Sequence, residues 1–201
     1  GASAVQNIGA YGVEVCSLIE KVEAVDAQTG SVRVFAPQEC MYGYRSSIFK
    51  HELRGRYYVT AVVFRLSSVF SPDLEYKAVR VAMSERGIAP GDITPERLRQ
   101  LVIEVRRSKL PDPKETGNAG SFFINPVVSR GVFENILAKY PQMPHYLMPD
   151  GNVKIPAGWL IEQSGWKGRS LGRAGVWPLQ ALVLVNLGDA TGQDIVALSE
   201  A

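Results

Sequence analysis

The residues that could bind a ligand or catalyse a reaction occur in short glycine-containing strings and not in motifs of established spacing. GxGxxG, GxxxxGK[ST], GxSxG and HExxH are all absent from the sequence. The two histidines, His51 and His145, are isolated, and the charged neighbours of His51 favour a solvated side chain over a general base. Cys16 and Cys40 lack the spacing of a disulfide framework or a zinc site, so we expect no metal.

Two strings in the first fifty residues have the composition of a ligand site. QNIGAYG (residues 6–12) has two glycines, which let the backbone approach a ligand, and amide side chains that both donate and accept. A plain turn is the structural alternative. GYRSS (43–47) places the Arg45 guanidinium between a phenol and hydroxyls, which suits a carboxylate or a phosphate. A surface arginine in a salt bridge is the alternative there.

Three further strings occupy the second half. KLPDP (109–113) is followed by GNAGSFFINP (117–126), where Ser121 comes after a glycine-flanked turn and could present a free hydroxyl, or instead bond within the turn. AGWLIEQ (157–163) has the character of packing residues. QALVLVN (180–186) has the pattern of a core strand, whose polar ends could face a pocket.

The elements that position these strings follow from the spacing of apolar residues. Alternation from Leu18 to Phe35, on either side of a glycine-closed loop at 26–30, predicts a β-hairpin, and residues 57–66 predict a strand. Helical spacing is present over 76–86. Thr94 is expected to cap a second helix, which has a proline at its first position and basic residues at its end.

The rest of the chain combines strands and helices. The expected elements are a strand over 121–128, a helix from the Ser129 cap to about Tyr140, a helix from Pro156 to Gly165, a buried strand over 181–186 and a C-terminal helix capped by Thr191. A β-rich part is thus followed by a mixed part, and the change falls between Ser67 and Thr94. We therefore predict an α+β fold.

Composition and charge limit the partners. The chain has 201 residues, of which 46% are hydrophobic and 21% charged, as in soluble globular proteins. A net charge of +2 with scattered basic residues predicts no nucleic-acid partner. The apolar run at 181–185 is far shorter than the ~18 residues of a membrane span. No signal peptide is visible, and we expect a cytoplasmic protein.

In this order, the strings resemble those of the UDP-N-acetylenolpyruvoylglucosamine reductase family, flavin enzymes that make UDP-N-acetylmuramate for peptidoglycan. GYRSSIFK (43–50) and GNAGSFFINP are the most specific, and with QNIGAYG and AGWLIEQ the resemblance extends from Gln6 to Asn186. It implies the C-terminal part of an FAD-binding domain at 1–90, with mostly antiparallel sheet. A smaller α+β substrate-binding domain at 91–201, incomplete at its C-terminus, would follow.

The resemblance also implies a reaction. NADPH reduces FAD, and hydride then passes to the vinyl carbon of UDP-N-acetylglucosamine enolpyruvate that is remote from the ether oxygen. Ser121 would protonate the adjacent carbon, and Arg45 would hold the substrate carboxylate. The residues implied at the substrate are Tyr44, Tyr76, Lys109, Asn125, Tyr146 and Gln180, and those implied at the flavin are Gln6, Asn7, Ile8, Gly9 and Tyr11.

Three positions depart from the family pattern: Ile124 replaces a lysine on the nucleotide-sugar side, Trp177 replaces a histidine, and Ser46 replaces an aspartate. The glycine-rich pyrophosphate loop expected before Gly1, and the Glu-Pro-Glu segment expected after Ala201 with a second catalytic acid, are missing. We therefore expect an inactive, monomeric fragment that holds FAD poorly. Two alternatives stay open: a non-catalytic nucleotide-sugar-binding module, and another flavin oxidoreductase of the same superfamily.

Overall fold

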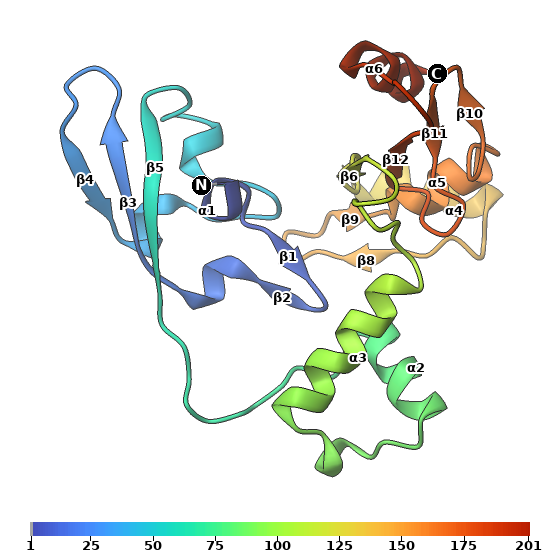
Figure 1. The fold of residues 1–201 in the computed structure, drawn as a ribbon, viewed down its shortest axis with the longest axis horizontal. Coiled ribbons are helices and arrows are strands. Elements are labelled where there is room, and N and C mark those ends of the chain that lie inside the picture. The colour runs from blue at the N-terminus through green and yellow to red at the C-terminus, as the bar shows by residue number, and fades with distance from the viewer. Residues whose placement is uncertain (1) are drawn as a thin grey trace. The chain divides into compact units, whose positions relative to one another are not determined.

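The computed structural model describes residues 2–201, and the chain divides into two compact units, Gly1–Val102 and Ile103–Ala201 (Figure 1). The division falls inside helix α3 (Pro95–Arg107), whereas the sequence prediction placed its domains at 1–90 and 91–201. All strand pairs between the named strands are antiparallel. Helices accompany the small sheets in both units, which confirms the α+β class.

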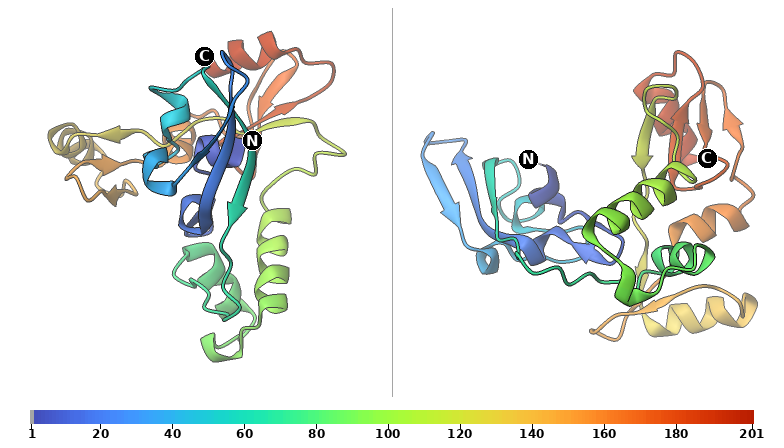
Figure 2. Two further views of the ribbon diagram at one scale, coloured as in Figure 1. Left: turned by 90° about the vertical axis from the view of Figure 1, so that its left-hand side faces the viewer. Right: turned by 60° about the horizontal axis from the view of Figure 1, so that its bottom comes forward.

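The first unit is built on a three-stranded sheet in the order β4-β3-β5, which can also be followed in Figure 2. Its strands are β3 (Ile19–Asp26), β4 (Val32–Phe35) and β5 (Tyr57–Phe64). The predicted hairpin and strand are confirmed. The hairpin loop closes where Gly30, at a φ of 69°, donates its N–H to the Asp26 carbonyl over 2.8 Å.

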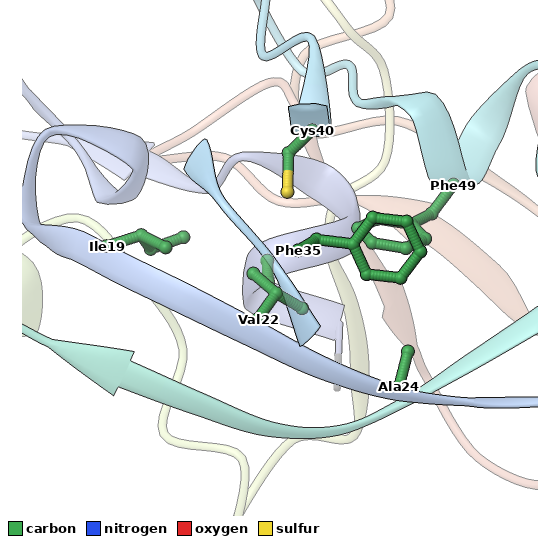
Figure 3. Close-up of a cluster of buried hydrophobic side chains, with 7 residues drawn as sticks. Ile19, Val22, Ala24, Phe35, Cys40 and Phe49 are labelled. Atoms are coloured by element: carbon green, nitrogen blue, oxygen red, sulfur yellow. The ribbon is translucent and has the colours of Figure 1, made fainter. Parts of the chain in front are cut away.

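The core of this unit lies against one face of the sheet. Val22 and Ala24, two residues apart on β3, are fully buried, because alternate side chains of a strand point to the same face. Figure 3 shows them beside Phe35, whose ring makes an edge contact with Phe49 at 5.2 Å between centroids. The short elements that cover this face or extend from it are α1 (Ala2–Gln6), β1 (Gly9–Ala10), β2 (Val13–Glu14), η1 (Val15–Leu18), η2 (Pro37–Cys40) and η3 (Ile48–Lys50).

Two helices end the first unit as predicted. Helix α2 (Lys77–Glu85) fills most of the expected 76–86, and η4 (Pro90–Asp92) leads to α3. Thr94 caps α3, since its hydroxyl accepts a hydrogen bond from the N–H of Arg97 over 3.3 Å. Leu101 and Val105, one turn apart on α3, are buried, which confirms the apolar face.

The second unit contains a four-stranded sheet in the order β10-β11-β12-β6 and a three-stranded sheet in the order β7-β9-β8. The strands are β6 (Asn118–Ser121), β7 (Val127–Val128), β8 (Tyr146–Leu147), β9 (Val153–Lys154), β10 (Ser170–Leu171), β11 (Ala174–Val176) and β12 (Val183–Asn186). The helices are α4 (Arg130–Lys139), α5 (Ala157–Gln163) and α6 (Gly192–Glu200). None of the helices formed by residues 2–201 is both long and apolar enough to cross a bilayer.

The prediction of one strand over 121–128 was wrong. Strand β6 ends at Ser121 and pairs with β12, whereas β7 begins at Val127 in the other sheet. Pro126 lies between them and has no N–H to donate, while its carbonyl accepts from Ile155 over 2.9 Å. The chain thus leaves one sheet directly after Ser121 and enters the next.

Helices α4 and α6 begin directly after the capping residues that the sequence predicted. Thr191 and Asp194 form a reciprocal cap at α6: the Thr191 hydroxyl accepts from the Asp194 N–H over 3.3 Å, and the carboxylate accepts from the Thr191 N–H over 2.7 Å. Ser129 precedes α4 as expected, but its side chain makes no capping hydrogen bond.

Candidate functional site

Arg45 joins the two polar strings of the first unit. Its guanidinium donates from Nη1 to the carbonyl of Asn7 over 3.1 Å and from Nη2 to the carbonyl of Gly9. These contacts span more than thirty residues of chain, so the strings at 6–12 and 43–47 form one local structure. Within residues 2–201 no carboxylate forms an ion pair with Arg45, so the alternative of a surface salt bridge does not apply.

Arg45 lies at the bend of a tight turn. Gly43 and Ser46 form an antiparallel bridge across it, and Arg45 has a φ of 52°, in the left-handed region. That conformation costs a non-glycine residue about 1–3 kcal/mol and persists only where neighbouring contacts enforce it. Such contacts are present: Lys50 donates from Nζ to the Arg45 carbonyl over 2.8 Å, and Ser46 Oγ lies 2.7 Å from His51 Nε2. The Tyr44 ring centroid lies 5.7 Å from the Arg45 guanidinium carbon.

Asn7 is the buried centre of this structure. Its side-chain amide donates to Glu14 Oε2 and to the Gly43 carbonyl, both over 2.9 Å, and accepts from the Cys16 N–H over 3.1 Å. Asn7 is fully buried, and its φ of 42° is one that asparagine tolerates better than most residues. Both hydrogens of the Asn7 side-chain amide are used within the protein, so this side chain joins residues 14, 16 and 43.

Other residues of the first string do reach the surface. The Ile8 side chain is 49% exposed, and the Tyr11 ring packs edge-on against Tyr76 with centroids 5.3 Å apart. Gln6 accepts from Lys50 Nζ over 2.7 Å. The structure therefore brings Tyr76, expected at the substrate, next to Tyr11, expected at the flavin.

Gly9 is required by the close approach of Arg45. A β-carbon at this position would lie 3.1 Å from Arg45 Nη1 and 3.1 Å from the Glu14 γ-carbon. The small residue predicted to let a cofactor approach thus also makes room for the guanidinium.

Two uncharged groups, the Cys40 thiol and the Tyr42 hydroxyl, are buried in the segment that leads into the Arg45 turn. The Tyr42 hydroxyl is buried with no hydrogen-bond partner among residues 2–201, and burial, with Cys40 nearby, raises the pKa of Tyr42. Burial likewise raises the pKa of the Cys40 thiol. Both groups are therefore neutral at pH 7.

Ser121 is the last residue of β6 and is exposed. It pairs with Val183 on β12 and follows Gly120, whose φ of 63° turns the chain so that its N–H meets the Asn118 side chain at 3.0 Å. In the part of the chain that the structure describes, the Ser121 hydroxyl makes no hydrogen bond. The alternative that this serine bonds within its own turn is therefore not what the structure shows.

Hydrogen bonds connect Lys109 to Trp177, and Trp177 to β12, within the second unit. The Trp177 indole donates from Nε1 to the Lys109 carbonyl over 3.0 Å, and the Trp177 N–H donates to the Val183 carbonyl over 2.8 Å. Val183 in turn faces Ser121. The tryptophan that replaces the family's histidine thus attaches the KLPDP segment to the strand beside the serine.

Asn125 and Gln180 both lie near the start of α5. Asn125 Oδ1 accepts from the N–H of Ala157 over 2.9 Å, and Gln180 Oε1 would lie 3.6 Å from a β-carbon on Gly158. Asn125 therefore has a structural bond that the sequence did not indicate. Tyr146 is placed apart from these residues, on β8 of the other sheet, where the Lys154 ammonium lies 5.5 Å from its ring centroid.

Sequence reasoning missed three residues that build the first unit's site. Glu14 receives the Asn7 amide, Ser47 is fully buried and donates to the Val5 carbonyl over 2.7 Å, and Lys50 binds the Arg45 carbonyl. Ser47 and Lys50 lie within the GYRSSIFK string itself, so its density of polar residues was the available signal. Among the described residues, no three His, Cys, Asp or Glu side chains cluster as metal ligands would.

Comparisons with known proteins point to one family. A family model described as the C-terminal domain of UDP-N-acetylenolpyruvoylglucosamine reductase matches residues 112–201. Two relatives carry the name UDP-N-acetylenolpyruvoylglucosamine reductase. The one from Porphyromonas gingivalis is 53% identical over 200 residues, and the one from Burkholderia multivorans is 48% identical over 201 residues. Each match covers the whole chain, and the chain spans 58% of each relative's length.

A solved structure shows the same fold. The crystal structure of UDP-N-acetylenolpyruvylglucosamine reductase from Thermus caldophilus superposes with a TM-score of 0.60 at 24% identity, over all of this chain and 54% of that one. Fold and matched strings together define the chain as a member of a reductase family. It belongs to the family of UDP-N-acetylenolpyruvoylglucosamine reductases.

Proposed function

We propose that this chain is part of a reductase that converts UDP-N-acetylglucosamine enolpyruvate to UDP-N-acetylmuramate. The reaction would use FAD and NADPH and would belong to cytoplasmic peptidoglycan synthesis. The observation that supports the proposal is the state of Arg45 and Ser121, the two residues implied to do the chemistry. Arg45 is fixed by two carbonyls, and the Ser121 hydroxyl is unengaged at the end of a strand. Relatives about half identical along the whole chain support it.

The residues at 6–12 fit a flavin. Ile8 presents an exposed apolar side chain, and Tyr11 presents a ring beside the backbone that binds Arg45. FAD bound there would accept hydride from NADPH and deliver it to the vinyl carbon of the substrate. The protein's contribution is to hold the enolpyruvyl group against the hydride donor and to supply the proton.

Arg45 would bind the substrate carboxylate. A guanidinium carries five N–H donors in a rigid fork, and the two carbonyl contacts leave the others for a carboxylate. Hydride addition to the remote vinyl carbon places negative charge on the adjacent carbon and its carboxylate. A fixed cation at that position stabilises the charge without reorganising.

Ser121 would then protonate the carbon that bears the ether oxygen and the carboxylate. A serine hydroxyl is a weak acid, but the enediolate-like species that it meets is strongly basic, so the transfer is reasonable once cationic groups polarise the site. Arg45 and Ser121 belong to different compact units. Lys109, Asn125, Gln180, Tyr44, Tyr76 and Tyr146 would line the substrate, and a monomer would suffice.

The experiment replaces Ser121 by Ala in the full-length gene product. Reduction of the flavin by NADPH should be unchanged, whereas turnover of the enolpyruvyl substrate should fall by about 10²–10⁴-fold, because only the second half-reaction needs the proton. Ser84→Ala, on the exposed surface of α2, is the matched control. Unchanged turnover in Ser121→Ala would remove the serine from its role.

One observation favours a non-catalytic alternative. Ile124 is 63% exposed where the family has a lysine, so a cation that would meet the diphosphate is missing. A module that binds the nucleotide sugar without reducing it would bind UDP-N-acetylglucosamine in a calorimetric titration but show no NADPH oxidation with the enolpyruvyl substrate. We also propose that the 201-residue chain alone is inactive, and a yellow, flavin-loaded preparation of it would contradict that.

A further inference from the structure

Lys50 connects the two strings around Arg45, and none of the functional roles described above includes it. Its ammonium donates to the main-chain carbonyl of Arg45 over 2.8 Å and to Gln6 Oε1 over 2.7 Å. It is the last residue of η3, which follows directly on the buried Ser47. The position of the ammonium is therefore set by a short helix whose start is anchored to the Val5 carbonyl.

These contacts hold Arg45 at both ends. The guanidinium is bound by the carbonyls of Asn7 and Gly9, and the peptide group that follows Arg45 is bound by Lys50. Arg45 has a left-handed φ of 52°, a conformation that persists where neighbouring contacts enforce it, and the Lys50 ammonium on its carbonyl is one of these contacts. The direction of the whole side chain depends on that backbone conformation.

We propose that Lys50 is a positioning residue for Arg45 in the reduction, an inference that rests on the proposed function. Lys50 does not touch the substrate. It holds the Arg45 carbonyl so that the guanidinium already points to the carboxylate position before substrate arrives. Displacement of a charged group by about 1 Å is enough to cost a reaction on the order of 10²-fold.

The first test compares three variants of the full-length gene product. Lys50→Met should lower kcat/KM for the enolpyruvyl substrate by roughly 10- to 100-fold and leave flavin reduction by NADPH unchanged. Lys50→Arg should recover most of the loss, because a guanidinium can also donate to two acceptors. Lys167→Met is the matched control, since its ammonium makes a 2.7 Å contact with Glu162 and belongs to the other compact unit.

A double-mutant cycle separates positioning from a general loss of stability. If Lys50 acts through Arg45, the variant with both Arg45→Lys and Lys50→Met should be no slower than Arg45→Lys alone. Losses that multiply would overturn the proposal. Thermal unfolding of each variant identifies any that do not fold, and for these the Lys50→Arg variant supplies the comparison.

A second readout is independent of turnover. In the NMR spectrum of the full-length protein, Lys50→Met should shift the Arg45 side-chain Nε–Hε signal and the Ser46 amide, and Lys167→Met should shift neither. If the unmodified protein does not reduce the enolpyruvyl substrate, the proposed function fails and these spectra still decide the positioning. Unchanged Arg45 signals in Lys50→Met would refute it.

Discussion

Replacement of Asn7 by Ala should be among the most destabilising single changes in the first unit. The change removes one hydrogen bond to a carboxylate and two to backbone groups, and it leaves the partly buried Cys16 N–H and Gly43 carbonyl without their partner. At about 1.5–3 kcal/mol for the charged bond and about 1 kcal/mol for each neutral one, the loss is roughly 3–5 kcal/mol. A typical domain is stable by only about 5–15 kcal/mol.

The backbone of Asn7 allows the hydrogen bonds to be separated from the strain. At a φ of 42°, glycine has no β-carbon to strain, so Asn7→Gly should be about 1 kcal/mol more stable than Asn7→Ala, although both lose the same bonds. Asn135→Ala, at an exposed position on α4, is the matched control and should change the free energy of unfolding by less than about 0.5 kcal/mol.

The assay must resolve the two units. Trp159, Trp166 and Trp177 all lie in the second unit, so tryptophan fluorescence in a urea titration follows that unit alone. Hydrogen exchange at the amides of Val22 and Ala24 on β3 follows the first. Asn7→Ala should accelerate exchange on β3 and leave the fluorescence midpoint in place. A loss below about 1 kcal/mol at β3, or an Asn7→Gly variant less stable than Asn7→Ala, would refute the reasoning.

Two further predictions concern the same unit. Gly9→Ala places a β-carbon 3.1 Å from Arg45 Nη1, so in the full-length enzyme kcat/KM for the enolpyruvyl substrate should fall about tenfold or more; Gly91→Ala, where a β-carbon meets nothing within 4 Å, should have no effect. The pKa of Asp26 is lowered mainly by the Gln28 N–H, with Tyr57, Thr29 and Arg56 adding to it. Its stabilisation is thus complete above the unfolded value of about 3.9 and lost as the pH falls through the lower folded value. The unmodified chain should therefore melt above Asp26→Asn at pH 7, and equal melting temperatures there would contradict this.

Much of the fold was predictable because its signals are local. The hairpin of β3 and β4 is closed by Asp26 and Gly30 within a few residues, and the cap of α6 by Thr191 and Asp194 within one turn. The break between β6 and β7 was not predictable, because it depends on Ile155, a residue 29 positions after Pro126. The boundary of the compact units was also invisible, since the apolar period of α3 continues through it.

The site was predicted in its residue types but not in its connections. Arg45 and Ser121 stood out because a guanidinium and a glycine-flanked serine are chemically conspicuous in short strings. The contacts of Asn7 with Gly43 and of Arg45 with Asn7 join residues 36 and 38 positions apart and leave no periodic pattern. For the same reason Asn7, expected near the flavin, is a buried structural residue, and Lys50 was overlooked beside a more obvious cation.

The double use of Arg45 also limits what a sequence can reveal about activity. One edge of the guanidinium fastens the turn at Asn7 and Gly9, so a copy of this gene freed from selection for catalysis would still be under pressure to keep the arginine in order to fold. Among the residues described, the Ser121 hydroxyl makes no hydrogen bond that the fold needs, so packing alone would not prevent substitution of this serine. Under the proposed function, loss of Ser121, and not of Arg45, is therefore the change that would identify a descendant of this chain that no longer catalyses the reaction.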